Sequence, residues 1–293
     1  MDIYRLLDAA VVGLVCLLIA FIQLTSQYYV LVPAYGGFGS AETWRKLVPF
    51  NVFVGLIWWH YYLACNTDPG RVPKEWEPPE NAVIVERKKS GRVQLRYCRT
   101  CRSHKPPRAH HCSSCGRCVL RMDHHCPWLN NCVGHGNHGH FLRFLFSVVL
   151  GCSYIGILLC LHLFHLYQTN QSYYDPVTYT PPPELHQVVL LALNMIGSAM
   201  VLIMVGGLFA YQVYCTGYGT STIESWEMDK IRKMIQQGRI PEATFPYDLG
   251  PRANFRSLLG SSWASWILPV KPLGTGLSFP ISVMKKGTCG CKI

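Results

Sequence analysis

Residues 98–132 read CRTCRSHKPPRAHHCSSCGRCVLRMDHHCPWLNNC and hold seven cysteines and five histidines. A structural zinc ion takes four such ligands in a tetrahedron, so two ions need eight. His111 and His125 are plausible ligands because each neighbours another ligand pair. Six cysteines at spacings typical of zinc knuckles would complete the eight: Cys98, Cys101, Cys112, Cys115, Cys118 and Cys132. One cysteine, Cys126, is then left over.

The left-over cysteine has two interpretations. Spacing alone also permits Cys126 as a ligand, with Cys132 spare. Chemistry favours Cys126 as the free thiol, since it ends the run Asp123-His124-His125-Cys126. A thiolate is the nucleophile, and a neighbouring histidine helps to form it. If Asp123 holds His124 in one tautomer, this run supplies a nucleophile, a base and an orienting carboxylate.

The rest of the chain has the composition of a membrane protein. Of its 293 residues, 49% are hydrophobic and only 15% are charged, whereas soluble domains have roughly 25% charged residues. Four apolar runs approach the roughly 20 residues that cross a bilayer. They cover residues 9–30, 47–65, 141–167 and 188–214. We predict an all-α polytopic membrane protein with four transmembrane helices; a set of buried core helices is the alternative.

Lysine and arginine are distributed unevenly around these runs. Residues 66–140 hold 13 of them and residues 215–293 hold 10, whereas residues 168–187 hold none. The positive-inside rule therefore places both termini and the long middle loop in the cytosol. There the cysteines are expected to bind metal rather than form disulfides. A glycosylation sequon at Asn170 falls on the lumenal side, close to the third run.

These observations predict four regions. Residues 1–65 hold transmembrane helices 1 and 2, residues 66–140 form a cytosolic zinc domain, residues 141–214 hold helices 3 and 4, and residues 215–293 form a cytosolic tail. A loop-rich zinc domain of this size has little apolar core, so bound metal would supply much of its folding energy.

The cysteine-rich stretch resembles the domain of DHHC-type protein S-acyltransferases, or palmitoyltransferases. The agreement continues in register through Cys132 to Val133-Gly134, and four spans around such a domain are similar to that family as well. Three further motifs carry the resemblance: a DPG motif at Asp68-Pro69-Gly70, a TTxE motif at Ser221-Thr222-Ile223-Glu224, and an aromatic-Asn element that includes Asn254. Serine replaces the first threonine of the TTxE motif and retains its hydroxyl.

The resemblance implies two closed structural zinc sites and a two-step acyl transfer. Cys126 would attack the thioester of a fatty acyl-CoA, His124 would take the thiol proton, and Asp123 would orient His124. The acyl group would then pass to a substrate cysteine, which makes the reaction ping-pong. The implied zinc ligands interleave: Cys98, Cys101, His111 and Cys118 form one set, and Cys112, Cys115, His125 and Cys132 form the other.

A fatty acyl-CoA combines an apolar tail with a polyanionic head. The tail favours the bilayer by about 0.8 kcal/mol for each buried CH₂, and the head favours cations. Trp128, next to the nucleophile, is predicted either to line the acyl entrance or to pack between loop and membrane. Four basic residues are candidates for the phosphates, namely Lys105, Arg108, Arg117 and Arg121; the alternative is a solvated surface or attraction to anionic lipid.

Thr222 and Glu224 have a role under either of two hypotheses. The resemblance suggests a hydrogen bond from this motif to the region of Asp123. The pattern is also typical of a helix cap, and both can hold because residues 223–234 read as an amphipathic helix.

Three stretches resemble a fungal branch of the family that resides in the endoplasmic reticulum and modifies a chitin synthase. They are Ser26-Gln27-Tyr28-Tyr29, residues 141–146 and residues 223–229. We therefore expect the endoplasmic reticulum, with the Golgi as alternative. The expected partners are the lipid bilayer and membrane-associated substrates with cytosolic cysteines, chitin synthase among them, and no nucleic acid. Cys289 and Cys291 are either acylated themselves or idle tail residues.

Two other classes of protein compete with the acyltransferase. A membrane scaffold or RING-like ubiquitin ligase would spend its cysteines and histidines on metal, and the intact run 123–126 argues against it. A zinc transporter would place ionisable ligands inside the spans. His60, His162 and His165 lie in or near spans but form no cluster with acidic residues.

Overall fold

The computed structural model describes residues 3–79, 85–87, 93–171, 183–242 and 244–282. Cys289 and Cys291 lie outside these ranges, and the sequon at Asn170 ends outside them. The chain forms two compact units. One consists of Ala10–His60 and Phe144–Phe209, and the other combines Met1–Ala9, Tyr61–Arg143 and Ala210–Ile293.

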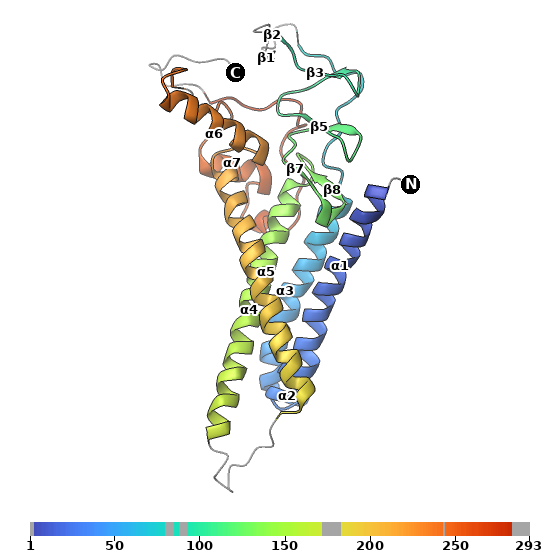
Figure 1. Cartoon of the computed structure of the whole chain (residues 1–293), viewed down its shortest axis with the longest axis vertical. Helices are drawn as coiled ribbons and strands as arrows, with labels where there is room; N and C mark the ends of the chain where they lie inside the picture. The colour runs from blue at the N-terminus through green and yellow to red at the C-terminus, as the bar shows by residue number, and fades with distance from the viewer. Residues whose placement is uncertain (1–2, 80–84, 88–92, 172–182, 243, 283–293) are drawn as a thin grey trace. The chain divides into compact units, whose positions relative to one another are not determined.

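Four helical segments of the described chain are long and apolar enough to cross a membrane: Leu6–Ala34, Ala41–Asn66, His138–Thr169 and Leu185–Gly217. The first covers most of α1 (Ile3–Thr25), the π-helical η1 (Ser26–Leu31) and α2 (Val32–Ala34). The others lie in α3 (Ala41–Asn66), α4 (His138–Gln171) and α5 (Leu185–Gly217) (Figure 1). The four predicted runs fall inside these segments, so the helical polytopic fold is confirmed. Each segment extends further at both ends than the run predicted from hydropathy.

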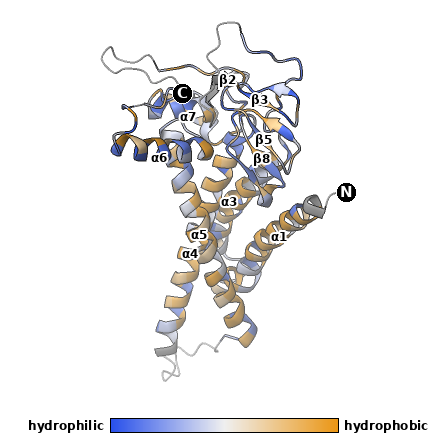
Figure 2. Cartoon of the chain, turned by 45° about the horizontal axis from the view of Figure 1, so that its top comes forward, coloured by the Kyte–Doolittle hydropathy of each residue, from blue (hydrophilic) through white to orange (hydrophobic). Residues whose placement is uncertain are grey.

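The unit that consists of Ala10–His60 and Phe144–Phe209 has an apolar core to which all four long helices contribute. Ile57 of α3 and Val148 of α4 are buried there, with Ile19 of α1 and Val201 of α5 packed against them. A Cβ atom at Gly151 would lie 3.0 Å from Ile57 Cδ1, so glycine lets α3 and α4 approach closely. Figure 2 shows the apolar character along these helices and the more hydrophilic character of α6.

The other unit contains four two-stranded antiparallel sheets. They pair β1 (Val85–Arg87) with β2 (Val93–Leu95), β3 (Tyr97–Cys98) with β4 (Ser103–His104), β5 (His110–Cys112) with β6 (Arg117–Val119), and β7 (His124–Cys126) with β8 (Asn131–Val133). A 3₁₀ turn, η2 (Pro127–Leu129), joins β7 to β8. Strands of two or three residues are too short to show a sequence period, so the sequence predicted loops here.

The tail adds α6 (Thr222–Gln236), α7 (Pro251–Leu259) and the 3₁₀ turn η3 (Ala264–Trp266). A capping box starts α6, because the Glu224 amide donates to Ser221 Oγ and the Ser221 amide donates to the Glu224 carboxylate. The predicted amphipathic helix over residues 223–234 is therefore confirmed.

The predicted DPG motif fixes the end of α3 to the hairpins. Gly70 has φ +108°, a conformation that favours glycine. Its amide donates to Asp68 Oδ1 at 2.8 Å, and Arg117 donates to Asp68 Oδ2 at 2.8 Å. The Gly136 amide donates to the Pro69 carbonyl at 3.0 Å. These bonds tie the chain leaving α3 to both β6 and the turn that precedes α4.

Candidate active site and metal-binding clusters

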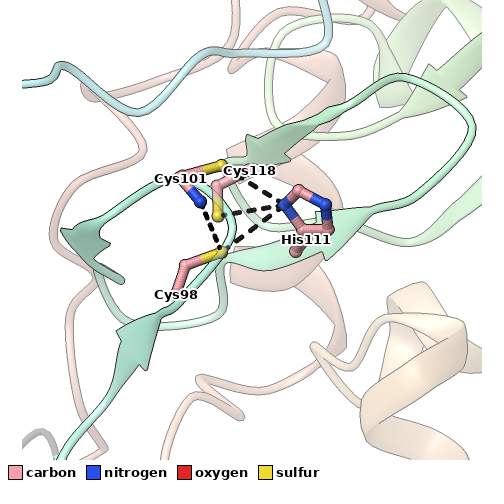
Figure 3. A group of neighbouring side chains, drawn as sticks. All are labelled: Cys98, Cys101, His111 and Cys118. Carbon is pink, nitrogen blue, oxygen red and sulfur yellow. Dashed lines mark hydrogen bonds between the residues drawn. The ribbon is translucent and has the colours of Figure 1, made fainter.

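The first set of predicted metal ligands converges on one point. Figure 3 shows Cys98 and Cys101 from the β3–β4 hairpin facing His111 and Cys118 from the β5–β6 hairpin. The three sulfurs lie 3.5, 3.3 and 3.9 Å from His111 Nδ1. All four ligand atoms lie within 4.8 Å of one another.

The second set converges in the same way. Cys115 Sγ and Cys132 Sγ lie 3.5 and 3.6 Å from His125 Nδ1, and 3.4 Å from each other. Cys112 completes a group whose ligand atoms also lie within 4.8 Å of one another. Each group offers three sulfurs and one imidazole nitrogen, a donor set that fits tetrahedral zinc. The two groups could therefore each hold one zinc ion.

Strand geometry explains why the two sets interleave. The register of the hairpins places His111 opposite Cys118 and His125 opposite Cys132. Successive side chains of a strand point to opposite faces. Adjacent His111 and Cys112 on β5 therefore serve different clusters, which is an arrangement that residue spacing alone did not indicate.

The same alternation separates Cys126 from the metal cluster. Cys126 follows His125 on β7, so its side chain points to the other face, which it shares with His124. His124 Nδ1 lies 2.7 Å from Asp123 Oδ2. Burial by itself would lower the pKa of His124, but interactions with Asp123 and Cys126 raise it to about 9. The structure thus brings Asp123, His124 and Cys126 together and leaves Cys132 in the second metal cluster.

Asp123 is completely buried and has four side-chain or backbone donors around its carboxylate. The Thr222 amide donates to Oδ1 at 2.7 Å, and the Thr222 hydroxyl donates to Oδ2 at 2.8 Å. Gln212 Nε2 and His124 Nδ1 also donate to Oδ2. Burial would raise the pKa of Asp123, yet these hydrogen bonds and the nearby histidines hold it well below its usual range. The contact expected from the Thr222 motif is present.

Gln212 is a site residue that sequence reasoning missed. It lies on α5, its side chain is buried, and its Oε1 lies 3.0 Å from His138 Nε2. Arg121 donates to His138 Nδ1 at 3.3 Å, so His138 donates to Gln212 through Nε2 and fixes the amide orientation. The available signal was an amide in an apolar run that also holds Asn194, ten residues before Thr222.

Cys126 is held near the end of a candidate membrane span. Asn131, paired with Cys126 across the β7–β8 hairpin, donates to the Ala64, Cys65 and Thr67 carbonyls at 3.3, 3.0 and 3.0 Å. The hydroxyl of Tyr61 on α3 donates to the backbone carbonyl of Trp128 at 2.8 Å, while the Trp128 side chain remains 54% exposed. The last turn of α3 thus sets the position of Cys126.

Three of the four predicted phosphate ligands have partners inside the protein. Arg108 is buried, pairs with Glu224 at 2.6 Å and lies over the rings of Phe245, Tyr247 and Phe279. Arg121 is buried beside His138, and Arg117 pairs with Asp68. Lys105 is partly exposed. The geometry therefore gives Arg108 a role in docking the tail in place of the predicted phosphate contact.

Asn254 lies where the tail returns to the end of α5. Its side-chain amide donates to the Gly217 carbonyl at 2.8 Å and to Asp248 Oδ1 at 2.7 Å, and its Oδ1 accepts from the Leu249 amide at 3.1 Å. Asn254 is buried and its side chain makes these three hydrogen bonds, so its role is to hold this backbone corner.

Comparison with known proteins adds independent findings. The family model described as DHHC palmitoyltransferase matches residues 92–229. The chain is 39% identical to palmitoyltransferase PFA4 of Mycosarcoma maydis over 92% of this chain and 60% of that protein. It is 34% identical to palmitoyltransferase PFA4 of Yarrowia lipolytica over 80% and 64% of the two chains.

A plant relative is covered more completely. The chain is 32% identical to the probable protein S-acyltransferase 13 of Arabidopsis thaliana, over 88% of this chain and 85% of that protein. The chain spans less than two thirds of the length of the two fungal relatives, at 60% and 64%. The similarity to the two fungal proteins supports the fungal branch that the sequence indicated.

Proposed function

The chain belongs to the DHHC palmitoyltransferase family, and from this premise we propose that it moves a palmitoyl or other long-chain acyl group from acyl-CoA to cysteines of membrane-associated proteins. The observation that carries the proposal is the placement of Cys126. It is the one cysteine of residues 98–132 outside both metal clusters, and it shares a strand face with His124.

The first step forms a thioester on Cys126. His124 holds Asp123 through Nδ1, which leaves Nε2 to take the Cys126 thiol proton. The thiolate attacks the carbonyl carbon of the acyl-CoA thioester, the new S–C bond forms, and the bond from that carbon to the CoA sulfur breaks. The proton held by His124 passes to the departing CoA thiolate, so atoms and charge balance.

The second step reverses these roles. A substrate cysteine gives its proton to His124 and attacks the acyl-Cys126 carbonyl, and Cys126 leaves as a thiolate that recovers the proton. Buried Asp123 stabilises the imidazolium in both steps, since its carboxylate is fixed by several donors.

The location suits a substrate that is half apolar and half charged. Asn131 and Tyr61 hold the Cys126 hairpin at the end of α3, a candidate membrane span. An acyl chain can remain in the bilayer while its thioester reaches the thiol. We assign Lys105 to the CoA phosphates, and we assign exposed Trp128 to the acyl chain where it leaves the bilayer.

The two cysteine–histidine clusters are proposed as structural zinc sites. Bound zinc supplies folding energy, and hairpins with strands of two or three residues are marginal without such support. Four ligands in each cluster leave no open position for a substrate, so the chemistry stays with Cys126 and His124.

The proposed setting is the endoplasmic reticulum membrane, with the zinc domain and both termini in the cytosol. The distribution of lysine and arginine supports the cytosolic placement. The choice of the endoplasmic reticulum over the Golgi rests on the resemblance of the sequence to the fungal branch. The proposed substrates are membrane-associated proteins with cytosolic cysteines. Chitin synthase is included because the sequence resembles the fungal branch that modifies it.

The test is intact-mass measurement of purified protein mixed with palmitoyl-CoA, before and after neutral hydroxylamine. Wild type is expected to gain one acyl mass that hydroxylamine removes. Cys126→Ser should stay folded, keep two zinc ions and gain nothing. Cys132→Ser is the matched control, and it should lose zinc from the second cluster.

Two outcomes would contradict the proposal. Loss of zinc in Cys126→Ser, together with normal acylation of a folded Cys132→Ser, would reverse the assignment of the two cysteines. Wild type that holds two zinc ions but never acylates would favour a non-enzymatic scaffold.

A further inference from the structure

Asp8, near the N-terminus, contacts His125 of the second metal cluster. His125 Nδ1 faces the sulfurs of Cys115 and Cys132, and His125 Nε2 lies 3.2 Å from Asp8 Oδ2. The two side chains are only 17% and 18% exposed. With Nδ1 turned toward the cluster, Nε2 carries the hydrogen and donates it to the carboxylate.

In the part of the chain that the structure describes, the first cluster has no matching contact. His111 also turns Nδ1 to its three sulfurs. Among the side chains that the structure describes, however, none makes a hydrogen bond or ion pair with Nε2 of His111. The two clusters share a donor set but differ in this one outer contact.

We propose that Asp8 is the outer carboxylate of the second metal site, orienting His125 and strengthening metal retention at that site alone. This inference rests on the zinc assignment of the proposed function. A carboxylate that accepts from the remote nitrogen of a ligating histidine fixes the ring orientation and raises ligand basicity, and its loss typically lowers metal affinity about 10–100-fold.

The position of Asp8 extends the role beyond the metal. Asp8 lies in the first turns of α1, at the start of the candidate span Leu6–Ala34. Its contact with His125 lies within one compact unit, which contains both Met1–Ala9 and Tyr61–Arg143. Since His125 precedes Cys126 on β7, the start of the first span helps to position the strand that carries the nucleophile.

A simple surface ion pair is the competing explanation. Exposed ion pairs contribute about 0–1 kcal/mol to stability. They have no reason to affect metal retention at one cluster and not at the other. A pair of that kind would leave metal release unchanged, or would change it equally at both clusters. Selectivity between the clusters therefore separates the two explanations.

The experiment compares full-length, zinc-loaded wild type with Asp8→Ala and Asp8→Asn during incubation with EDTA and an alkylating reagent. Peptide mass spectrometry follows two cysteine sets, Cys112, Cys115 and Cys132 against Cys98, Cys101 and Cys118. In Asp8→Ala the cysteines of the second cluster should become alkylated about 10–100-fold faster, and those of the first cluster should react at the wild-type rate. Asp8→Asn keeps an acceptor without the charge and should fall between. Asp229→Ala, which removes an exposed carboxylate of α6, is the control and should match wild type.

An unchanged alkylation rate of the second-cluster cysteines in both variants would overturn the inference. An equal acceleration of both sets would also overturn it, because Asp8 would then support the fold in general. If Asp8→Ala cannot be purified, Asp8→Asn decides, since it is isosteric. The assay contains no acyl-CoA, so its result does not depend on whether Cys126 can be acylated.

Discussion

Gln212 on α5 donates a 3.0 Å hydrogen bond from Nε2 to Oδ2 of buried Asp123. The same amide group lies 3.1 Å from the Thr222 hydroxyl. Its carbonyl oxygen accepts from His138, so the amide cannot flip without losing all three contacts. The end of α5 thereby fixes the carboxylate that orients His124.

Gln212→Ala should slow thioester formation on Cys126 about 10–100-fold while zinc content stays at two per chain. A hydrogen bond to a charged group contributes about 1.5–3 kcal/mol, and each 1.36 kcal/mol is about tenfold in rate. The measurement is the single-turnover rate of Cys126 acylation at saturating acyl-CoA. Gln212→Glu should be slower still, because it places a second carboxylate against Asp123.

Gln236→Ala is the matched control for this prediction, since Gln236 is exposed at the end of α6. It should acylate at the wild-type rate. Normal acylation by Gln212→Ala would show that Asp123 keeps its geometry through Thr222 alone.

The buried pair Arg108–Glu224 should make stability depend on acidity. Burial would raise the pKa of Glu224, but Arg108 holds that pKa below the usual 4.5. A carboxyl with a depressed folded pKa contributes its full stability above the unfolded pKa and loses it as pH falls through the folded pKa. Glu224→Gln should therefore lose about 3–5 kcal/mol of its free energy of unfolding at pH 7. Its melting temperature should accordingly lie well below that of wild type.

The difference in melting temperature between wild type and Glu224→Gln should stay constant above about pH 5 and shrink as the pH falls below it. Thermal melts of both proteins in the same detergent between neutral and acid pH would measure it. Both lose zinc alike in acid, so their difference isolates Glu224. A difference that grows on acidification would contradict the assigned sign.

Gly134→Ala should disrupt the junction between β8 and the DPG turn. A Cβ at Gly134 would lie 2.7 Å from the Pro69 carbonyl oxygen and 2.9 Å from the Leu120 carbonyl oxygen, both of them backbone atoms. Overpacking of this kind costs about 1–3 kcal/mol, which a thermal melt detects. Gly55→Ala is the control, since no atom lies within 4 Å of its added Cβ; equal melting of both variants would refute the steric argument.

The sequence indicated much of this fold and site because both rest on local signals. Apolar runs predicted all four long helices, and cysteine and histidine spacing predicted two metal clusters. The run from Asp123 to Cys126 predicted a free thiol, and the structure places Cys126 outside both metal clusters. These signals are short in sequence and chemically distinctive.

Contacts between distant segments were not predictable in the same way. Asp8 and His125 are separated by 117 positions, and Gln212 and Asp123 by 89. Nothing in the sequence near Asp8 indicates its contact, and an amide within an apolar run was the one signal at Gln212. Arg108 illustrates the opposite error: a basic residue in a basic loop predicted a phosphate contact, whereas the folded chain pairs it with Glu224.

Asn131 has a consequence for how this protein family can vary in length. Its side-chain NH₂ lies within hydrogen-bonding distance of three carbonyls at and just beyond the end of α3, so a distant amide takes the place of a local cap. These bonds then set the position of the β7–β8 hairpin relative to the end of α3. The length of the chain that joins α3 to the hairpin does not set it. Cys126 should therefore keep its position relative to the last turn of α3 when residues are inserted or deleted in the chain between α3 and β3.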